Sequence, residues 1–238
     1  LNLLTGWELQ ALAIKDYFNG NINAELLVVS DCAGIEKLPA RIFFRNFDQL
    51  TDLDQYALSL CKGKVLDLGA GAGSHSLILQ NRGFLVYSID IAADAVEVMR
   101  RRGLRHAYCA DASSLRGPKF DTILMMMNGL GVVQDLSGLT QFLHNIKRLL
   151  RPRGQILVDS SDLHYLEEVM GIAGKKILKQ GKDYGKISYR FAYKGMLSAP
   201  FHWLFIDQET LQSYASHTGW QCQIIFEEDF QYLARLFF

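Results

Sequence analysis

The sequence predicts a doubly wound α/β fold, in which a mostly parallel sheet carries helices on both faces. Across residues 63–160, short apolar runs typical of buried strands alternate with segments whose apolar residues recur at helical spacing. A glycine follows each predicted helix, where a left-handed backbone often ends a helix: these are Gly83, Gly103 and Gly154. Such alternation is typical of parallel strands joined by right-handed crossovers.

The individual elements of this region follow from the same two periodicities. We expect buried strands at residues 64–68, 84–90, 105–109, 120–126 and 154–159. Between these strands we expect helices at residues 74–82, 92–102 and 136–150.

Residues 1–62 are expected to form an N-terminal cap or extension with helical and extended parts. Apolar residues at helical spacing predict a helix at 7–18, and the segment 24–30 is expected to be extended. A second helix is expected at 51–60, because Thr51 is a suitable N-cap and aspartates follow in the first turn.

Residues 161–238 change character and predict antiparallel pairs. Segments 186–195 and 201–207 are expected to pair around Gly195, and residues 207–219 read as a capped helix. The chain then finishes in a hairpin of residues 220–229 and 230–238.

The composition argues against several classes of partner. Lys and Arg total 25 and Asp and Glu total 25, so the net charge is zero and no bulk attraction to nucleic acid or anionic membrane is expected. No apolar run reaches the roughly 20 residues that a spanning helix needs. The four cysteines are scattered without metal-ligand spacing, which indicates free thiols in a reducing, cytoplasmic setting. Nothing in the sequence indicates an oligomeric state.

A glycine-rich loop follows the first predicted strand, in the stretch VLDLGAGAGSHS at residues 65–76. The glycines of this loop have the spacing GxGxG. The typical dinucleotide-binding loop has the spacing GxGxxG, and the position of its third glycine is occupied here by Ser74. Asp67 precedes the loop, and a buried carboxylate there would repel a pyrophosphate and attract a cation. S-adenosylmethionine carries an ammonium and a sulfonium and no phosphate, so it fits this loop better than a nicotinamide dinucleotide.

Two further aspartates follow at the ends of the next predicted strands. Asp90 lies roughly twenty residues beyond Asp67, the spacing at which an acid accepts hydrogen bonds from a ribose; the alternative is a helix N-cap. Asp111 follows the third strand and could accept from an adenine amine; the alternative is a turn aspartate. Asn128 and Gly129 end the fourth strand, beside the expected switch point of the sheet.

Together these residues resemble the class I S-adenosylmethionine-dependent methyltransferases, a seven-stranded Rossmann-like family. The final hairpin is similar to the antiparallel strands that close this family's sheet. The resemblance implies that Asp67 acts on the cofactor's ammonium side, Asp90 on the ribose hydroxyls, and Asp111 with the Ala112 amide on adenine. The full set of expected cofactor-binding residues is Asp67, Gly69, Ala70, Gly71, Gly73, His75, Asp90, Ile91, Asp111, Ala112, Met127, Asn128 and Arg45.

The resemblance divides the chain into the extension 1–62 and a methyltransferase domain at 63–238. Within that domain, residues 161–205 are longer than a minimal member needs and read as an inserted hairpin segment. With residues 1–50 they are expected to cap the acceptor pocket.

Departures from the family's subtypes narrow the expected acceptor. The fourth strand ends in MMMNGLG, without the NPPY or DPPY typical of methylation at adenine or glutamine amino groups. No Pro-Cys pair offers a thiol nucleophile for cytosine carbon. The resemblance and the balanced charge therefore favour methyl transfer to an oxygen, nitrogen or carbon atom of a small molecule. The alternatives are a protein or RNA methyltransferase, or a non-catalytic cofactor-binding protein of the same fold.

Methyl transfer is an in-line displacement, so a general base is needed only for an acceptor that is protonated at working pH. The candidate catalytic residues are His75, Asn128, Asp159 and His202. For His75, the alternative is a histidine that hydrogen-bonds locally at a helix start.

Two further interpretations concern charged residues near the site. Arg45, in RIFFRNF, is expected to close over the cofactor's carboxylate; the alternative is an amphipathic strand with snorkelling arginines. Asp159 and Asp162 with Asn128 could imitate oxygen ligands of a divalent metal, but the DSSD cluster reads better as helix capping, so no metal is expected.

Overall fold

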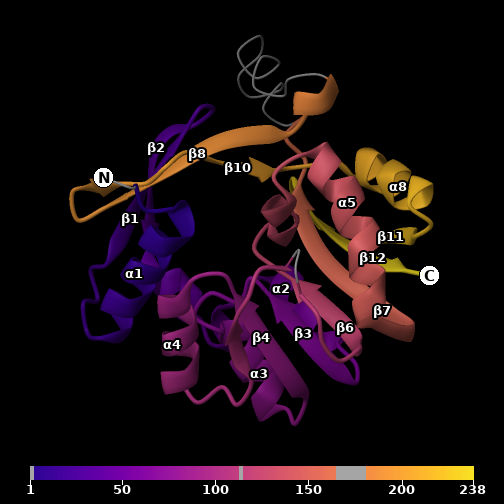
Figure 1. Cartoon of the computed structure of the whole chain (residues 1–238), viewed down its shortest axis with the longest axis horizontal. Helices are drawn as coiled ribbons and strands as arrows, with labels where there is room; N and C mark the ends of the chain where they lie inside the picture. Colours follow the sequence, from indigo (N-terminus) through magenta and orange to yellow (C-terminus); the bar gives the residue numbers. More distant parts are fainter. Residues whose placement is uncertain (1–2, 113–114, 165–180) are drawn as a thin grey trace.

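The computed structural model describes residues 3–112, 115–164 and 181–238, and within them the chain forms two sheets. The larger sheet has seven strands, and the smaller, antiparallel sheet has five. In Figure 1 the smaller sheet lies in the upper part of the view, above α1 and the strands β3 and β4.

The larger sheet has the strand order β11-β12-β7-β6-β3-β4-β5. The five strands from β7 to β5 in this order pair in parallel, and β12 and β11 pair antiparallel at one edge, as the sequence predicts. The order reverses between β3 and β6, which makes a switch point where parallel sheets commonly bind ligands. The strands are β3 (Lys64–Leu68), β4 (Leu85–Asp90), β5 (Ala107–Cys109), β6 (Phe120–Met125), β7 (Leu150–Ser161), β11 (Gln221–Glu228) and β12 (Gln231–Phe237).

Helices cover both faces of this sheet, and each face has its own core. Leu143 and Leu211 pack with Tyr232 in one cluster, while Leu58 and Leu79 pack with Leu157 in the other. The doubly wound architecture is therefore confirmed. The helices are α1 (Gly6–Phe18), α2 (Asp52–Ser59), α3 (Ser74–Asn81), α4 (Ala93–Arg101), α5 (Leu136–Ile146) and α8 (Gln208–His217).

The return from α5 to β7 differs from the prediction. The helix expected at 136–150 ends at Ile146 and continues as the short 3₁₀ turn η5 (Lys147–Leu149), and β7 starts at Leu150. Gly83 and Gly103 have positive φ as expected, but here Arg153 has φ of 63° and Gly154 does not. The strand register shifts opposite this point, so a bulge absorbs the turn that Gly154 was expected to make.

The smaller sheet joins segments that lie far apart in the sequence, in the order β10-β8-β1-β2 with β9 on β8. The expected pairing of 186–195 with 201–207 is present, and β1 pairs with β8. Strand β2 was not predicted, because its mostly exposed, charged and glycine-containing residues carry no apolar alternation. The strands are β1 (Glu25–Ser30), β2 (Gly34–Pro39), β8 (Lys186–Tyr193), β9 (Met196–Leu197) and β10 (Phe201–Leu204). Residues 165–180 of the predicted insertion lie outside the described residues.

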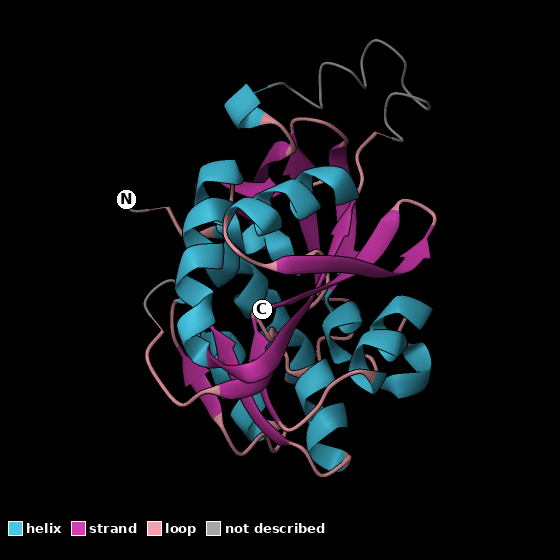
Figure 2. Cartoon of the chain, turned by 90° about the vertical axis from the view of Figure 1, so that its right-hand side faces the viewer, coloured by secondary structure: helices cyan, strands magenta, loops and turns pink. Residues whose placement is uncertain are grey.

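Contacts of α1 and β10 join the part of the chain around the smaller sheet to the part around the larger one. Figure 2 shows the strands and helices of both parts, turned by 90° from Figure 1. Lys15 of α1 forms ion pairs with Asp94 at 2.8 Å and Glu97 at 2.7 Å, both on α4. The indole Nε1 of Trp203 on β10 donates to the Asn128 carbonyl oxygen at 3.0 Å, next to the 3₁₀ turn η4 (Gly129–Val133). None of the described helices combines the length and hydrophobicity that a bilayer-spanning segment requires.

Gly131 allows Trp203 to approach η4, which gives a stability prediction. A Cβ built on Gly131 would lie 1.8 Å from Trp203 Nε1, so Gly131→Ala must displace the indole. We expect the free energy of unfolding to fall by about 1–3 kcal/mol, as for an overpacked core, measured by urea denaturation. Gly117→Ala is the matched control, since its Cβ would meet nothing within 4 Å. Equal stability of the two variants would contradict the close contact.

Candidate active site

A cavity of about 890 Å³ lies at the carboxyl ends of the central parallel strands, between the two sheets. Both sheets and α1 contribute to its walls. All the expected cofactor-binding residues except Gly73 line it. The structure thus brings together, from separate strand ends, the residues that the sequence predicts as one site.

The glycine loop exposes its backbone to this cavity. Gly69 has φ of 79° and Gly71 has φ of 55°, conformations that side chains rarely adopt. A Cβ built on Gly69 would meet no atom within 4 Å, so the space beside it is open. A ligand can therefore lie against the loop backbone at Gly69.

Gly73 was expected to bind the cofactor, but it lies outside the cavity lining. It is the N-cap of α3 with φ of 79°, and a Cβ there would lie 2.5 Å from Leu104 and 3.0 Å from Met99. Gly73 therefore permits the close packing of α3 against α4 and does not line the cavity.

Asp67 is buried at the end of β3 and is held by a chain of hydroxyls. Ser88 Oγ donates to Ser76 Oγ at 2.6 Å, and Ser76 Oγ donates to Asp67 Oδ2 at 2.6 Å. Burial raises the pKa of the Asp67 carboxyl above its usual range. Because a buried anion is costly, a cation arriving in the cavity would be stabilised beside it.

Asp90 ends β4 and fixes the glycine loop. Its Oδ2 accepts from the Gly71 amide and its Oδ1 accepts from the Ala92 amide, both at 2.9 Å. Burial raises the pKa of this carboxyl as well. The helix N-cap alternative does not hold, because α4 has Ala92 as its N-cap. Asp111 follows β5 at an exposed position that also lines the cavity.

A cluster of the half-buried Arg45 and the buried Asp54 and His75 lies beside the glycine loop. Asp54 Oδ2 is 3.2 Å from Arg45 Nη2, and Asp54 Oδ1 is 3.1 Å from His75 Nε2. Arg45 and His75 line the cavity, and Asp54 holds both. The segment before Arg45 is the 3₁₀ helix η1 (Ala40–Phe44), so the amphipathic-strand alternative is wrong.

Asp54 was not among the site residues expected from the sequence. It lies in the first turn of α2, three residues after the N-cap Thr51, where an acid suits the helix dipole. Only the fold places it between Arg45 and His75, so no sequence signal identified the pair.

This cluster shifts the pKa values of its members in opposite directions. Burial acts to raise the pKa of Asp54, but the hydrogen bond and charge of His75 and the charge of Arg45 lower it overall. Burial acts to lower the pKa of His75, but its hydrogen bond to Asp54 and the nearby carboxylates raise it overall. The geometry therefore favours a protonated His75 that donates to Asp54.

Asn128 and Asp159 form a second polar cluster at the end of β6. Asp159 accepts from the amides of Asn128 at 2.8 Å and Gly129 at 3.0 Å, and Ser161 Oγ donates to Asn128 Oδ1 at 2.7 Å. Met127 and Asn128 have positive φ, so these bonds hold a strained turn. Burial raises the pKa of Asp159 to about 6.

The other residues considered for chemistry lie apart from the cavity. His202 stands between Phe201 and Trp203 on β10, so its side chain faces the opposite side of the sheet, and it does not line the cavity. Asp162 accepts from the His164 amide and ring, both on its own loop. Among the described residues, no three His, Cys, Asp or Glu side chains gather as a metal site.

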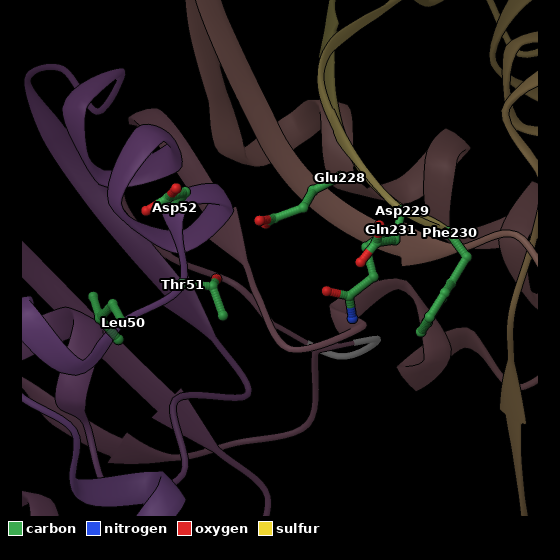
Figure 3. A pocket seen from close by; sticks show the side chains of 7 residues that line it. All are labelled: Leu50, Thr51, Asp52, Glu228, Asp229, Phe230 and Gln231. Carbon is green, nitrogen blue, oxygen red and sulfur yellow. The ribbon is translucent and has the colours of Figure 1, made fainter.

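A second, more acidic pocket of about 420 Å³ lies between the start of α2 and the turn of the β11–β12 hairpin. Figure 3 shows its carboxylates, which belong to Asp52, Glu228 and Asp229. None of the predicted site residues lines this pocket.

Comparison with known proteins places the cavity in context. A family model described as a methyltransferase domain matches residues 65–154. The chain is 39% identical to an S-adenosylmethionine-dependent methyltransferase from Bacteroides fragilis solved with S-adenosyl-L-homocysteine; the match covers 99% of this chain and 97% of that one, with a TM-score of 0.88.

More distant solved structures share the fold alone. PH0226 from Pyrococcus horikoshii OT3 is 19% identical over 82% of this chain and 96% of its own, with a TM-score of 0.57. The CcbJ methyltransferase from Streptomyces caelestis is 14% identical over 80% of this chain and 93% of its own, with a TM-score of 0.60.

The raised pKa of His75 predicts a pH-dependent contribution to stability. The charged form is favoured in the fold, so its stabilisation is complete below the ordinary pKa of 6.5 and is lost as pH rises through the raised value. We therefore expect His75→Gln to lower the free energy of unfolding more at pH 6 than at pH 9, measured by urea denaturation. His144→Gln, at an exposed site on α5, should change it at neither pH. A pH-independent loss in His75→Gln would refute the charged pair.

Proposed function

The chain belongs to the S-adenosylmethionine-dependent methyltransferases, and we propose that it methylates an oxygen, nitrogen or carbon atom of a small molecule. S-adenosylmethionine is its cofactor. The observation that carries the proposal is the cavity itself. Asp67, Asp90 and Asp111 reach it from the ends of three neighbouring strands, beside a glycine loop with open space at Gly69.

The residues present fit this cofactor chemically. Carboxylates suit an ammonium, ribose hydroxyls and an adenine amine, and a buried acid at Asp67 disfavours a phosphate. We assign Asp67 to the ammonium side, Asp90 to the ribose hydroxyls, and Asp111 with the Ala112 amide to adenine. Arg45 and His75 together supply positive charge for the carboxylate of the methionine part.

The bound cofactor supplies an electrophilic methyl group on a positively charged sulfur. The protein residues then have to orient the acceptor and exclude water, and such positioning can contribute about 7–11 kcal/mol in favourable cases. Neither His75 nor Asp159 suits a general base. The Nε2 of His75 is engaged by Asp54, and both oxygens of Asp159 accept from backbone amides. We propose catalysis chiefly by positioning.

The size of the cavity supports a small acceptor. Its volume of about 890 Å³ lies within the range of roughly 300–1,000 Å³ for small-molecule sites. The cofactor takes the part beside β3, β4 and β5, and the acceptor takes the remainder beneath the smaller sheet.

Gly69 offers a direct test of where the cofactor lies. Gly69→Ala places a methyl group in the open space, and Gly83→Ala is the matched control because both glycines have positive φ and an empty Cβ position. Each should lose about 1 kcal/mol of stability from backbone strain. Only Gly69→Ala should weaken S-adenosylhomocysteine binding, measured by calorimetric titration. Equal affinity of the two variants for S-adenosylhomocysteine would show that the cofactor does not lie against the loop.

Asp90 tests the ribose assignment. Asp90→Ala removes a charged acceptor, so we expect binding of S-adenosylhomocysteine to weaken by about 1.5–3 kcal/mol. Asp94→Ala is the control, since Asp94 pairs with Lys15 and does not line the cavity. An unchanged affinity of Asp90→Ala for S-adenosylhomocysteine would show that the ribose does not bind Asp90. A wild-type protein that binds no S-adenosylhomocysteine would overturn the proposed function.

A further inference from the structure

The smaller sheet and α1 cover the cavity with an aromatic wall, formed by Trp7, Tyr189, Phe191, Phe201 and Trp203. The rings are in mutual contact. Trp7 lies with ring centroids 4.7 Å from Phe201 and 5.4 Å from Trp203, and Phe201 lies 4.9 Å from Phe191 and 5.9 Å from Tyr189. This continuous surface suits the flat face of a ring-containing ligand.

The aromatic wall is fixed beside the proposed cofactor site. Trp203 Nε1 donates to the Asn128 carbonyl, and Asn128 also lines the cavity. A ring lying on the wall is therefore held in a defined position relative to the end of β6. From there the wall extends across β10 and β8 toward β1 and β2.

A single carboxylate stands at the far end of this surface. Glu36 on β2 lies opposite Val28 on β1, and Val28 lies opposite Phe191 on β8. All three line the cavity. Neighbouring strands are about 4.8 Å apart, so Glu36 stands roughly 10 Å across the sheet from the backbone of Phe191.

The charge that the smaller sheet and α1 bring to the cavity is negative. Among the described residues, the smaller sheet and α1 bring Glu36 to the lining and no Lys, Arg or His. Arg45 and His75 lie beside the glycine loop and are paired with Asp54. Glu36 is exposed, and within the described chain it has no hydrogen-bond or ion-pair partner, so its carboxylate is available to a ligand cation.

We propose that the acceptor is an arylalkylamine, whose ring lies on the aromatic wall and whose protonated amine pairs with Glu36 as an anchor. The methyl group then goes to a nucleophilic atom at the ring end of the molecule, and the proton that this atom carries is lost to solvent. This inference rests on the proposed function and names the substrate class of its acceptor site. An anionic acceptor would meet an uncompensated carboxylate there. An ammonium would meet both that carboxylate and the electron-rich faces of the rings.

The test compares ligands that share a ring and differ in charge. Tryptamine, 3-ethylindole and indole-3-propionate are titrated calorimetrically into the protein saturated with S-adenosylhomocysteine. We expect tryptamine to bind most tightly and indole-3-propionate about tenfold or more weakly, the ratio that a charge interaction of about 1.4 kcal/mol gives. We expect Phe201→Leu to weaken tryptamine and 3-ethylindole alike, because both use the ring surface.

The variant Glu36→Gln isolates the charge. It should bring tryptamine close to the affinity of 3-ethylindole without changing S-adenosylhomocysteine binding. Glu25→Gln is the matched control, because Glu25 lies on the neighbouring strand, pairs with Lys37 and does not line the cavity. Tighter binding of the propionate, no preference among the three ligands, or no effect of Glu36→Gln would each overturn the proposal. In those cases intact S-adenosylhomocysteine binding would leave the proposed function standing.

Discussion

The site depends on one constraint, which is that carboxylates buried at the ends of parallel strands must find hydrogen-bond donors. Asp90 takes the amide of Gly71, and Asp159 takes the amides of Asn128 and Gly129. In each case the donor belongs to the loop after a neighbouring strand. The hydrogen bonds that offset the cost of burying these carboxylates therefore also fix the loops that line the cavity.

This constraint also explains the uneven charge of the cavity. The acids that hold the loops keep the carboxyl edge negative, which suits a ligand with a sulfonium and an ammonium. One local exception is the cluster around Asp54, in which Arg45 and His75 lie beside the glycine loop and pair with the Asp54 carboxylate. In the proposed assignment, the positive and negative ends of the zwitterionic cofactor therefore face opposite charges within one cavity.

The two sheets contribute different parts of the cavity wall. The proposed cofactor side is built mainly by the loops of the seven-stranded sheet, whereas the proposed acceptor side is built by α1 and the strands β1, β2, β8 and β10. Trp203 links the two sides through the Asn128 carbonyl, with Gly131 leaving room for its ring. Changes in the acceptor side can therefore alter substrate choice while the cofactor side stays intact.

The sequence by itself determined the central strands, the helices between them, and the acids at the strand ends. These features come from local periodicity and from the rule that parallel strands share one carboxyl edge, so Asp67 and Asp90 can be placed together from the chain's own pattern. Only the tertiary structure decided that Asp54 joins Arg45 to His75, that Gly73 serves packing, and that His202 faces away. The tertiary structure also brings Glu36 and Phe191 into the lining of the same cavity. Each of these depends on pairings between distant segments, whose register no local pattern specifies.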